Sequence, residues 1–337
     1  MKIPLIFSSN DYFVPYMSVM ITSIMNFADD KNEYEIIILH SSISLDNQKI
    51  LTEHILQKNN FSVRFIDVTE YIANHSLYTE NRDFFTAEAY YRLLAPYLLP
   101  EYDKAIYMDG DMVALTDVAE LFDIDIENYM IAAVRDYCGI SDSYNPDSDR
   151  KVYMEKELKL KNFENYYISG LLVLNLKMFR EKIELKEMMQ LASSRNWRCH
   201  DQDILNIITE NKTMLLNAKW NVLQDYGTHH FMPDNLYREW KESYMEPYIV
   251  HFGGDAKPWR YPRVKKSNFF WDFAKETPYL FEIKHRTKEE LKNNKLYRIK
   301  YMVQFLFPLG SKSRVVVKRI TKPIWQAIKK HTTNTKK

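Results

Sequence analysis

Residues 105–111 read AIYMDGD, an apolar run that ends at two carboxylates, Asp109 and Asp111, with one glycine between them. The run follows a turn-like segment, which is typical of a buried strand in a parallel sheet. Ligands of open α/β sheets bind at the carboxyl ends of such strands. Gly110 lets the backbone bend, so both carboxylates can share one Mg²⁺ or Mn²⁺ ion, which prefers oxygen ligands. Asp and Gly are also ordinary turn residues, and this stretch alone also fits a solvated turn.

Hydrophobic periodicity predicts how the rest of the chain is built around this strand. Short apolar or β-branched runs predict strands at 3–7, 35–39, 61–68, 105–108, 130–134, 170–175 and 248–250. Apolar residues at helical spacing predict helices within 14–25, 50–55, 86–99, 115–122 and 204–208. Right-handed crossovers then give an α/β fold, a doubly wound sheet with its loops gathered at one edge. The polar stretch 137–151 is expected to be a loop, either a mobile lid or a plain surface excursion.

Length and composition limit the class of protein. A chain of 337 residues exceeds the size at which one core usually stops growing, so one large domain with an appendage and two domains are both open. The two cysteines, Cys138 and Cys199, have no CxxC spacing and cannot form a disulfide framework, which favours a reducing cytoplasm. No secretion signal is visible, and no uncharged apolar stretch reaches the ~18 residues of a spanning helix.

The net charge of +1 hides two oppositely charged parts of the chain. Residues 284–337 carry sixteen Lys and Arg against two Glu, a net charge of +14, which leaves −13 for residues 1–283. This asymmetry predicts a folded acidic domain over 1–283 and a basic segment over 284–337 that binds an anionic surface.

The basic segment also has the pattern of an amphipathic helix. Apolar residues recur four apart, with Trp325 as an aromatic anchor, at Val316, Ile320, Ile324 and Ile328. The basic residues around them suit an anionic membrane surface, where each contributes ~1 kcal/mol. Pro323 kinks such a helix or divides it in two. A solvated tail and a docking helix for a protein partner stay open, whereas nucleic acid is not expected, because no recognisable binding fold accompanies the charge.

Three of the predicted strands deliver groups that bind metal or phosphate. These groups are Asp109 with Asp111, Ser169 with Gly170, and His251 with Gly253, Gly254 and Lys257. One imidazole and two carboxylates form a reasonable Mn²⁺ site that leaves positions for a diphosphate. Bare backbone amides and a lysine beside that imidazole suit a phosphate-bearing ligand. His251 alone would also fit a structural histidine, but the block HFGGDAKPW at 251–259 is far less generic.

Six motifs follow one another along residues 1–262. They are FSSNDYFVPY at 7–16, YYRL at 90–93, YMDGD at 107–111, SGLLVLN at 169–175, DQDILN at 201–206 and HFGGDAKPW at 251–259. In these motifs and their order, the sequence resembles glycosyltransferase family 8, the retaining transferases of the GT-A fold, a Rossmann-like doubly wound mixed sheet. The family includes bacterial lipopolysaccharide galactosyltransferases and glucosyltransferases.

The resemblance assigns the metal and the donor to named residues. Asp109 and Asp111 match the DxD motif, which with His251 would hold Mn²⁺, or Mg²⁺ in its place, against the diphosphate of a UDP-sugar. Lewis-acid neutralisation of the leaving UDP would supply most of the rate. The remaining donor contacts implied by the resemblance are Ser8, Ser9 and Asn10 at base and ribose, Phe13 on uracil, Arg92, Gly110 and Ser169 near the donor, and Gly254 and Lys257 on the β-phosphate.

The resemblance also places three residues at the transferred sugar. Asp136 and Asp201 match residues that hydrogen-bond this sugar, and Gln202 occupies the position nearest the anomeric carbon. An amide is a poor nucleophile, so we favour same-face attack within an ion pair, in which a UDP oxygen helps to deprotonate the incoming hydroxyl. A covalent intermediate on Asp201 is the alternative route.

Some positions depart from the family pattern. Ile168 stands where many members have Asn, which removes an amide contact with the donor sugar and puts the donor's identity in doubt. Asn10 and Tyr12 replace the usual Asp and Asn, so recognition of the base would be looser, although a uridine ring should still stack on Phe13.

The resemblance implies an enzyme that moves galactose or glucose from a UDP-sugar to a cell-surface saccharide. Lipopolysaccharide, capsule and glycoprotein glycans are the expected acceptors, and we expect the growing saccharide to be carried on a lipid. We expect a cytoplasmic protein attached peripherally to the inner face of the plasma membrane. A non-catalytic UDP-sugar sensor is the second reading, and a metal-dependent phosphohydrolase would leave Phe13 and Gln202 unexplained.

Overall fold

The computed structural model describes residues 1–73, 75, 77, 86–224, 229–311, 313, 314, 316 and 317. Most of the predicted amphipathic tail helix, including Ile320, Ile324, Trp325 and Ile328, lies outside the described residues. Within them, no helix is both long and apolar enough to cross a bilayer.

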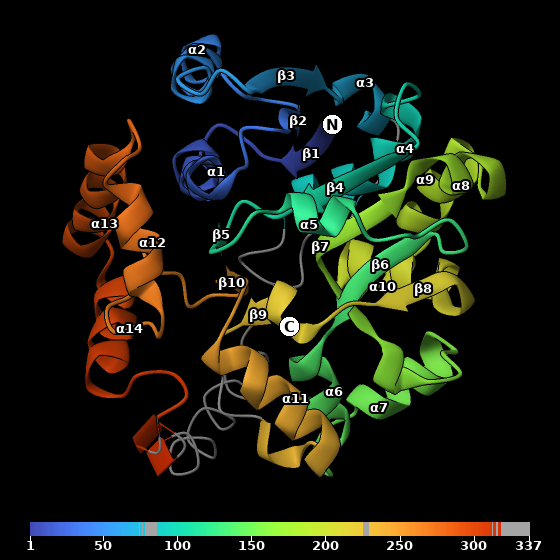
Figure 1. The fold of residues 1–337 in the computed structure, drawn as a ribbon. Coiled ribbons are helices and arrows are strands. Elements are labelled where there is room, and N and C mark those ends of the chain that lie inside the picture. Colours follow the sequence, from blue (N-terminus) through green and yellow to red (C-terminus); the bar gives the residue numbers. More distant parts are fainter. Residues whose placement is uncertain are drawn as a thin grey trace.

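A seven-stranded sheet forms the centre of the molecule (Figure 1), with strand order β3-β2-β1-β4-β7-β6-β8. The first three strands run parallel and are joined through helices α1 (Val14–Phe27) and α2 (Leu45–Ile55). The seven strands are β1 (Lys2–Ser8), β2 (Glu33–His40), β3 (Phe61–Asp67), β4 (Lys104–Met108), β6 (Ile131–Arg135), β7 (Tyr167–Asn175) and β8 (Thr213–Leu215). The βαβαβ unit predicted for the N-terminal part is therefore present.

Strand β7 reverses the direction of the sheet at its centre. It pairs antiparallel with β4 on one side and with β6 on the other, so the sheet is mixed. Ser169 and Gly170 consequently lie near the start of their strand, whereas the sequence placed them with the strand ends. Because β7 is antiparallel, its start meets the carboxyl end of β4, and the Asp109 amide donates to the Gly170 carbonyl at 2.8 Å.

A second, three-stranded sheet brings His251 to the same edge. It consists of β5 (Met112–Ala114), β10 (Ile249–His251) and β9 (Val222–Leu223), in the order β5-β10-β9. His251 pairs with Met112, and the Phe252 amide donates to the Asp111 carbonyl at 2.9 Å. Strand β9 has only two residues and was not predicted.

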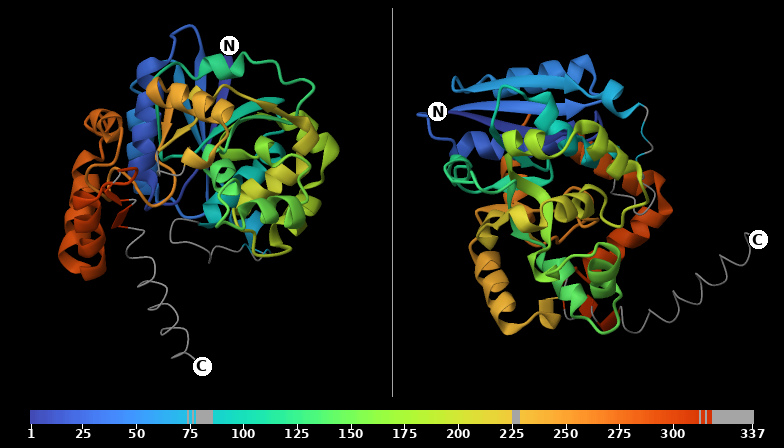
Figure 2. Two further views of the ribbon diagram at one scale, coloured as in Figure 1. Left: turned by 90° about the horizontal axis from the view of Figure 1, so that it is seen from below. Right: turned by 90° about the vertical axis from the view of Figure 1, so that its right-hand side faces the viewer.

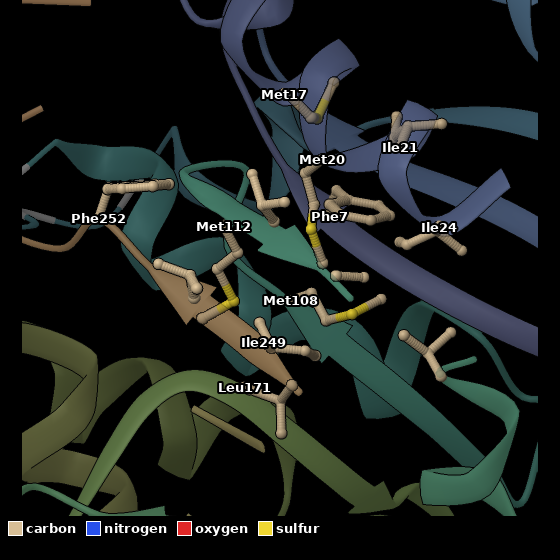
Figure 3. Packing of buried hydrophobic residues seen from close by; sticks show 14 of the residues in the cluster. Phe7, Met17, Met20, Ile21, Ile24, Met108, Met112, Leu171, Ile249 and Phe252 are labelled. Atoms are coloured by element: carbon tan, nitrogen blue, oxygen red, sulfur yellow. The ribbon is translucent and has the colours of Figure 1, made fainter. Parts of the chain in front are cut away.

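Hydrophobic clusters cover both faces of the large sheet. In β1, Leu5 and Phe7 join one cluster and Ile6 joins the other, as the period of two in a strand requires. Figure 3 shows the first cluster, where Met17 and Met20 of α1 lie over the ends of β4 and β5. A Cβ at Gly110 would lie 2.9 Å from the Met17 Cβ, so this packing leaves no room for a side chain. The turn between the two aspartates is thereby fixed against α1.

Two of the predicted elements, one helix and one loop, need correction. The predicted helix 86–99 is a 3-10 helix, η1 (Ala87–Leu94), followed by α4 (Ala95–Leu98), because Pro96 is tolerated only in the first turn of a helix. The predicted loop 137–151 contains α6 (Tyr137–Ser143) and the start of α7 (Arg150–Val152). An Asp136 carboxylate oxygen accepts from the Gly139 amide at 2.9 Å and caps α6, a signal that the polar composition obscured.

The remaining helices lie around these sheets. The longer ones are α8 (Leu176–Lys182), α9 (Leu185–Ser193), α10 (His200–Ile208), α11 (Asp234–Met245), α12 (Ser267–Ala274), α13 (Leu280–Asn293) and α14 (Lys295–Leu306). The short ones are α3 (Thr69–Ile72), α5 (Ala119–Phe122), η2 (Tyr153–Glu157), η3 (Phe163–Asn165), η4 (Glu210–Lys212), η5 (Ala218–Trp220) and η6 (His229–Phe231).

The C-terminal helices pack on the body of the molecule. Figure 2 shows α12 to α14 beside α1, and α1 contacts both α12 and α13. Helix α13 runs across residue 283, where the charge changes sign. Ile283 of α13 and Tyr297 of α14 are fully or nearly fully buried in the first hydrophobic cluster.

Candidate active site

Two carboxylates and one imidazole converge at the carboxyl end of β4. The ligand atoms of Asp109, Asp111 and His251 all lie within 4.8 Å of one another, as a single divalent cation requires. The His251 Nε2 is 3.3 Å from an Asp111 carboxylate oxygen and 3.9 Å from one of Asp109. The sequence predicted this set, and the structure brings all three together.

Asn221, which precedes β9, orients the imidazole. Its Oδ1 lies 2.9 Å from the His251 Nδ1, and both side chains are buried. An amide oxygen only accepts, so in this orientation Nδ1 carries the hydrogen and Nε2 turns its lone pair toward the carboxylates. The Asp111 Oδ1 is buried without a hydrogen-bond donor among the described residues. A cation would satisfy both this oxygen and Nε2, so the three side chains fit a divalent metal.

Gly170 makes room for this cluster. A Cβ at this position would lie 2.5 Å from the His251 ring and 2.8 Å from an Asp109 carboxylate oxygen. The backbone of β7 therefore approaches the metal ligands more closely than any side chain would permit, as the sequence predicted for this glycine. Gly253 is similarly restricted, because its Cβ would lie 3.2 Å from Nε2.

Arg92 of η1 joins two acidic residues beneath the cluster. Its Nη2 donates to Asp109 at 2.9 Å, its Nε lies 3.1 Å from Asp201, and its Nη1 donates to the Ser169 carbonyl. The guanidinium also stacks on the Tyr107 ring at 4.3 Å. Arg92 was predicted to lie near the donor, and in the structure its guanidinium pairs with Asp109 and Asp201.

The two aspartates of the cluster differ electrostatically. Burial and the neighbouring Asp111 raise the pKa of Asp109, in spite of Arg92. Burial also acts to raise the pKa of Asp111, but Lys257 and His251 outweigh it and hold that pKa below its ordinary value. The Lys257 Nζ donates directly to an Asp111 oxygen. Lys257 thus lies at the metal cluster, within reach of any phosphate bound there.

The residues predicted at the sugar form a second connected group. The Gln202 Nε2 donates to Asp136 at 3.1 Å, and its Oε1 accepts from the Ser169 amide at 3.2 Å. The amide of Gln202 is therefore held at both ends. Its neighbour Asp201 is buried, and burial raises the pKa of Asp201 to about 6, although Arg92 opposes this shift.

The predicted nucleoside residues lie in the turn between β1 and α1. The Asn10 Oδ1 accepts from the Phe13 amide at 3.0 Å, and the Asn10 Nδ2 donates to Glu88 at 3.1 Å. Ser9 is buried, and the Ser8 Oγ is buried without a hydrogen-bond partner among the described residues. Because β1 and β4 are neighbouring parallel strands, this turn lies at the same edge as the metal cluster.

The glycine-rich block after β10 faces this turn. Gly254 has a φ of 75°, in the left-handed region that favours glycine. The Phe13 ring meets Trp259 edge-on, with 6.0 Å between centroids. Nucleoside and phosphate residues predicted from separate motifs are therefore adjacent.

The model of glycosyl transferase family 8 matches residues 4–262 of the chain. The chain belongs to glycosyltransferase family 8. Among its relatives, general stress protein A of Bacillus subtilis is 26% identical over 74% of this chain and 85% of that protein. A putative glycosyltransferase of Haemophilus influenzae is 29% identical over 64% of this chain and 62% of its own length. The lipopolysaccharide 1,2-glucosyltransferase of Escherichia coli is 27% identical over 60% of this chain and 61% of its own length. The chain thus spans less than two thirds of the last two relatives.

Solved structures of glycosyltransferases share this family fold. The bifunctional glycosyltransferase WbbM matches with a TM-score of 0.77 and 26% identity, over 85% of this chain and 52% of that one. Galactosyltransferase LgtC, solved with donor and acceptor sugar analogues, matches with a TM-score of 0.66 and 21% identity. The match covers 82% of this chain and 96% of that one. The predicted family, the GT-A fold and the classification as a transferase are thus confirmed.

Sequence reasoning within the family motifs missed Asn221 and Tyr107 as site residues. Tyr107 supports Arg92 and donates through its hydroxyl to Asp109 at 3.1 Å. Its place two residues before Asp109, on the same face of the strand, could have indicated this role. Asn221 had no such signal, because only the pairing of β9 with β10 brings it to His251.

Proposed function

We propose that the protein is a Mn²⁺-dependent retaining transferase that moves galactose or glucose from UDP to a saccharide acceptor. The observation that carries this proposal is the cluster of Asp109, Asp111 and His251, where one buried Asp111 oxygen accepts no hydrogen bond among the described residues and Lys257 donates to the other. Mg²⁺ suits the same oxygen ligands, but an imidazole ligand favours Mn²⁺.

The cluster and its neighbours would divide the binding of the donor. Asp109, Asp111 and His251 hold the cation, which when bound neutralises the charge that develops on the leaving UDP. Lys257, which donates to Asp111, would contact the β-phosphate together with the backbone amide at Gly254. Phe13 stacks on uracil, with Ser8, Ser9 and Asn10 along base and ribose. Gly110 and Arg92 shape the floor of this surface.

The way in which Gln202 and Asp201 are held supports retention of configuration. The Gln202 amide is fixed between Asp136 and Ser169, where its oxygen can stabilise positive charge at the anomeric carbon. Asp201 is paired with Arg92, which makes it a weak nucleophile. The bond between the anomeric carbon and the phosphate oxygen breaks, the acceptor hydroxyl attacks from the same face, and its proton passes to that phosphate oxygen. Trapping a sugar covalently on Asp201 would overturn this route.

The acceptor is proposed to be a cell-surface saccharide on a lipid carrier, such as a lipopolysaccharide, a capsule chain or a glycoprotein glycan. The name of the Escherichia coli relative, a lipopolysaccharide 1,2-glucosyltransferase, supports the first of these. Buried Ile168 stands at the edge of the sugar group and would select the donor through shape instead of through an amide contact.

Release of UDP from a panel of UDP-sugars, measured with Mn²⁺ and then with EDTA, tests this function. We expect UDP-galactose or UDP-glucose to be consumed only with the metal, faster when a saccharide acceptor is present. Binding of UDP with Mn²⁺ but no turnover on any donor would favour the UDP-sugar sensor and contradict the proposal. Repeating the panel with Ile168→Asn shows whether this residue sets donor preference.

A second part of the proposal places the enzyme on the inner face of the plasma membrane. Helix α14 exposes five large apolar side chains, and three exposed basic residues lie among them. The apolar residues are Leu296, Ile299, Met302, Phe305 and Leu306, and the basic ones are Lys295, Arg298 and Lys300. An anionic lipid surface matches both the apolar area and the charge.

Flotation with anionic vesicles tests this attachment on the full chain. We expect a variant with both Ile299→Glu and Met302→Glu to float less than the wild type, and both proteins to float poorly with zwitterionic vesicles. Equal flotation of the two proteins on anionic vesicles would contradict a role for α14.

A further inference from the structure

Two consecutive residues of α13 contact two different segments of the donor surface. The Arg286 Nη1 donates to the carbonyl oxygen of Tyr12, in the turn that carries Phe13. The Thr287 Oγ1 donates to the carbonyl oxygen of Trp259 at 2.5 Å, two residues after Lys257. One turn of a C-terminal helix therefore touches both the predicted nucleoside segment and the predicted phosphate segment.

Stacked aromatic rings join these two segments beneath Arg286. Its guanidinium lies 4.5 Å from the centroid of the Tyr12 ring and 5.8 Å from that of Tyr16. Tyr16 in turn stacks on Trp259, with 4.3 Å between centroids and 15° between planes. Phe13 meets Trp259 edge-on and also lies 5.5 Å from Tyr16, measured between ring centroids. The position of the Phe13 ring therefore depends on how these stacked rings pack. Arg286 lies at the outer end of the stack.

Helix α13 is held in place by contacts before, within and after it. Ile283 is fully buried, and the Tyr279 hydroxyl before the helix donates to Asn47 of α2 at 3.0 Å. Glu282, one turn before Arg286, pairs with its guanidinium and holds it over the rings. After the helix, the Tyr297 hydroxyl donates to the Arg260 carbonyl. The helix is thus anchored on both sides of the donor surface.

We propose that α13 clasps the nucleotide end of the donor site, with Arg286 as the positioning residue that holds the 10–13 turn against the 257–259 segment. The inference rests on the proposed function, because that function makes these two segments the binding surface for UDP. A clasp that orders both segments before UDP arrives lowers the entropy lost on binding. Arg286 thereby improves donor affinity without touching the reacting atoms.

Arg286→Ala tests the clasp through a split between KM and kcat. We expect the Kd of UDP with Mn²⁺ and the KM of the donor to rise about tenfold, while kcat stays within about twofold, because the sugar end of the site is untouched. Arg286→Lys keeps the positive charge over the rings but loses the planar guanidinium. Its Kd for UDP should therefore lie between those of the wild type and Arg286→Ala. Arg238→Ala, at an exposed arginine of α11, is the matched control and should bind UDP as the wild type does.

Calorimetric binding of UDP distinguishes failure of the clasp from failure of the proposed function. A wild-type chain that binds no UDP with Mn²⁺ would overturn the function. Unchanged UDP affinity in Arg286→Ala, or a fall in kcat with KM unaltered, would overturn the clasp alone. Thr287→Val, nearly equal in volume, removes the contact with Trp259 and should give the same split at an unchanged melting temperature if the clasp is correct.

Discussion

Two Asp-x-Asp sequences meet at one edge of the sheet and are used differently. At 109–111 both carboxylates converge on His251 and form the metal cluster. At 201–203 only Asp201 faces the site, where it pairs with Arg92. Asp203 points away and accepts from two tyrosine hydroxyls, those of Tyr153 and Tyr166, each at 2.6 Å.

The local backbone explains this difference. In a helix each residue is rotated by about 100° from the last, so side chains two apart lie on nearly opposite faces. Asp201 and Asp203 begin α10 and diverge accordingly. Asp109 and Asp111 occupy a turn between β4 and β5, where Gly110 has no side chain to keep the backbone away from α1. The same sequence pattern thus forms a candidate metal site in one place and a buried hydrogen-bonding group of the fold in the other.

The largest effect should come from breaking the first pair. Asp109→Asn and Asp111→Asn each remove a charged metal ligand, and we expect either to reduce transfer on the order of 10³-fold, because charge on the leaving group is no longer neutralised. Thermal melting should change little, since neither residue stabilises the hydrophobic clusters. Transfer that stays Mn²⁺-dependent in both variants would show that the pair is only a turn.

The second pair should separate stability from activity. Asp203→Ala leaves two buried tyrosine hydroxyls without an acceptor and should destabilise the fold by about 3 kcal/mol in denaturant titrations. Asp201→Asn should cost less stability than this, because the isosteric amide keeps an oxygen that accepts from the Arg92 Nε. It should nevertheless reduce kcat. Equal effects of the two changes on stability would refute the distinction between them.

A smaller effect should follow from loosening the imidazole that completes the first pair. Asn221→Leu removes the acceptor that fixes the His251 tautomer, and we expect about tenfold weaker Mn²⁺ binding, measured by electron paramagnetic resonance of the free ion. The fold should persist, because leucine has a similar volume and the site is buried. Wild-type affinity in this variant would mean that packing by Gly170 and Gly253 alone orients the ring.

The sequence predicted groups of residues better than it predicted how strands run. Asp109, Asp111 and His251 could be assigned because apolar runs end at them, and Gln202 through its motif. The direction of β7 could not be predicted, because an apolar strand buried on both faces reads the same either way. Asn221 was missed since only long-range pairing brings it to the site.

In the C-terminal part, too, a local sequence pattern does not show which elements pack together. Its charge predicted a segment separate from the domain, beginning at 284. Helix α13 runs across that position and contacts the Tyr12 and Trp259 carbonyls through Arg286 and Thr287. A net charge reports surface composition, whereas a buried residue such as Ile283 decides what packs together.

Calorimetric titration of UDP into the wild-type chain and into Asp111→Asn, each with Mn²⁺ and with EDTA, tests the central claim most directly. If Asp109, Asp111 and His251 hold the metal that binds the donor diphosphate, UDP should bind tightly only to the wild type with Mn²⁺. Equal UDP affinity in EDTA, or in the Asp111→Asn chain, would contradict the account.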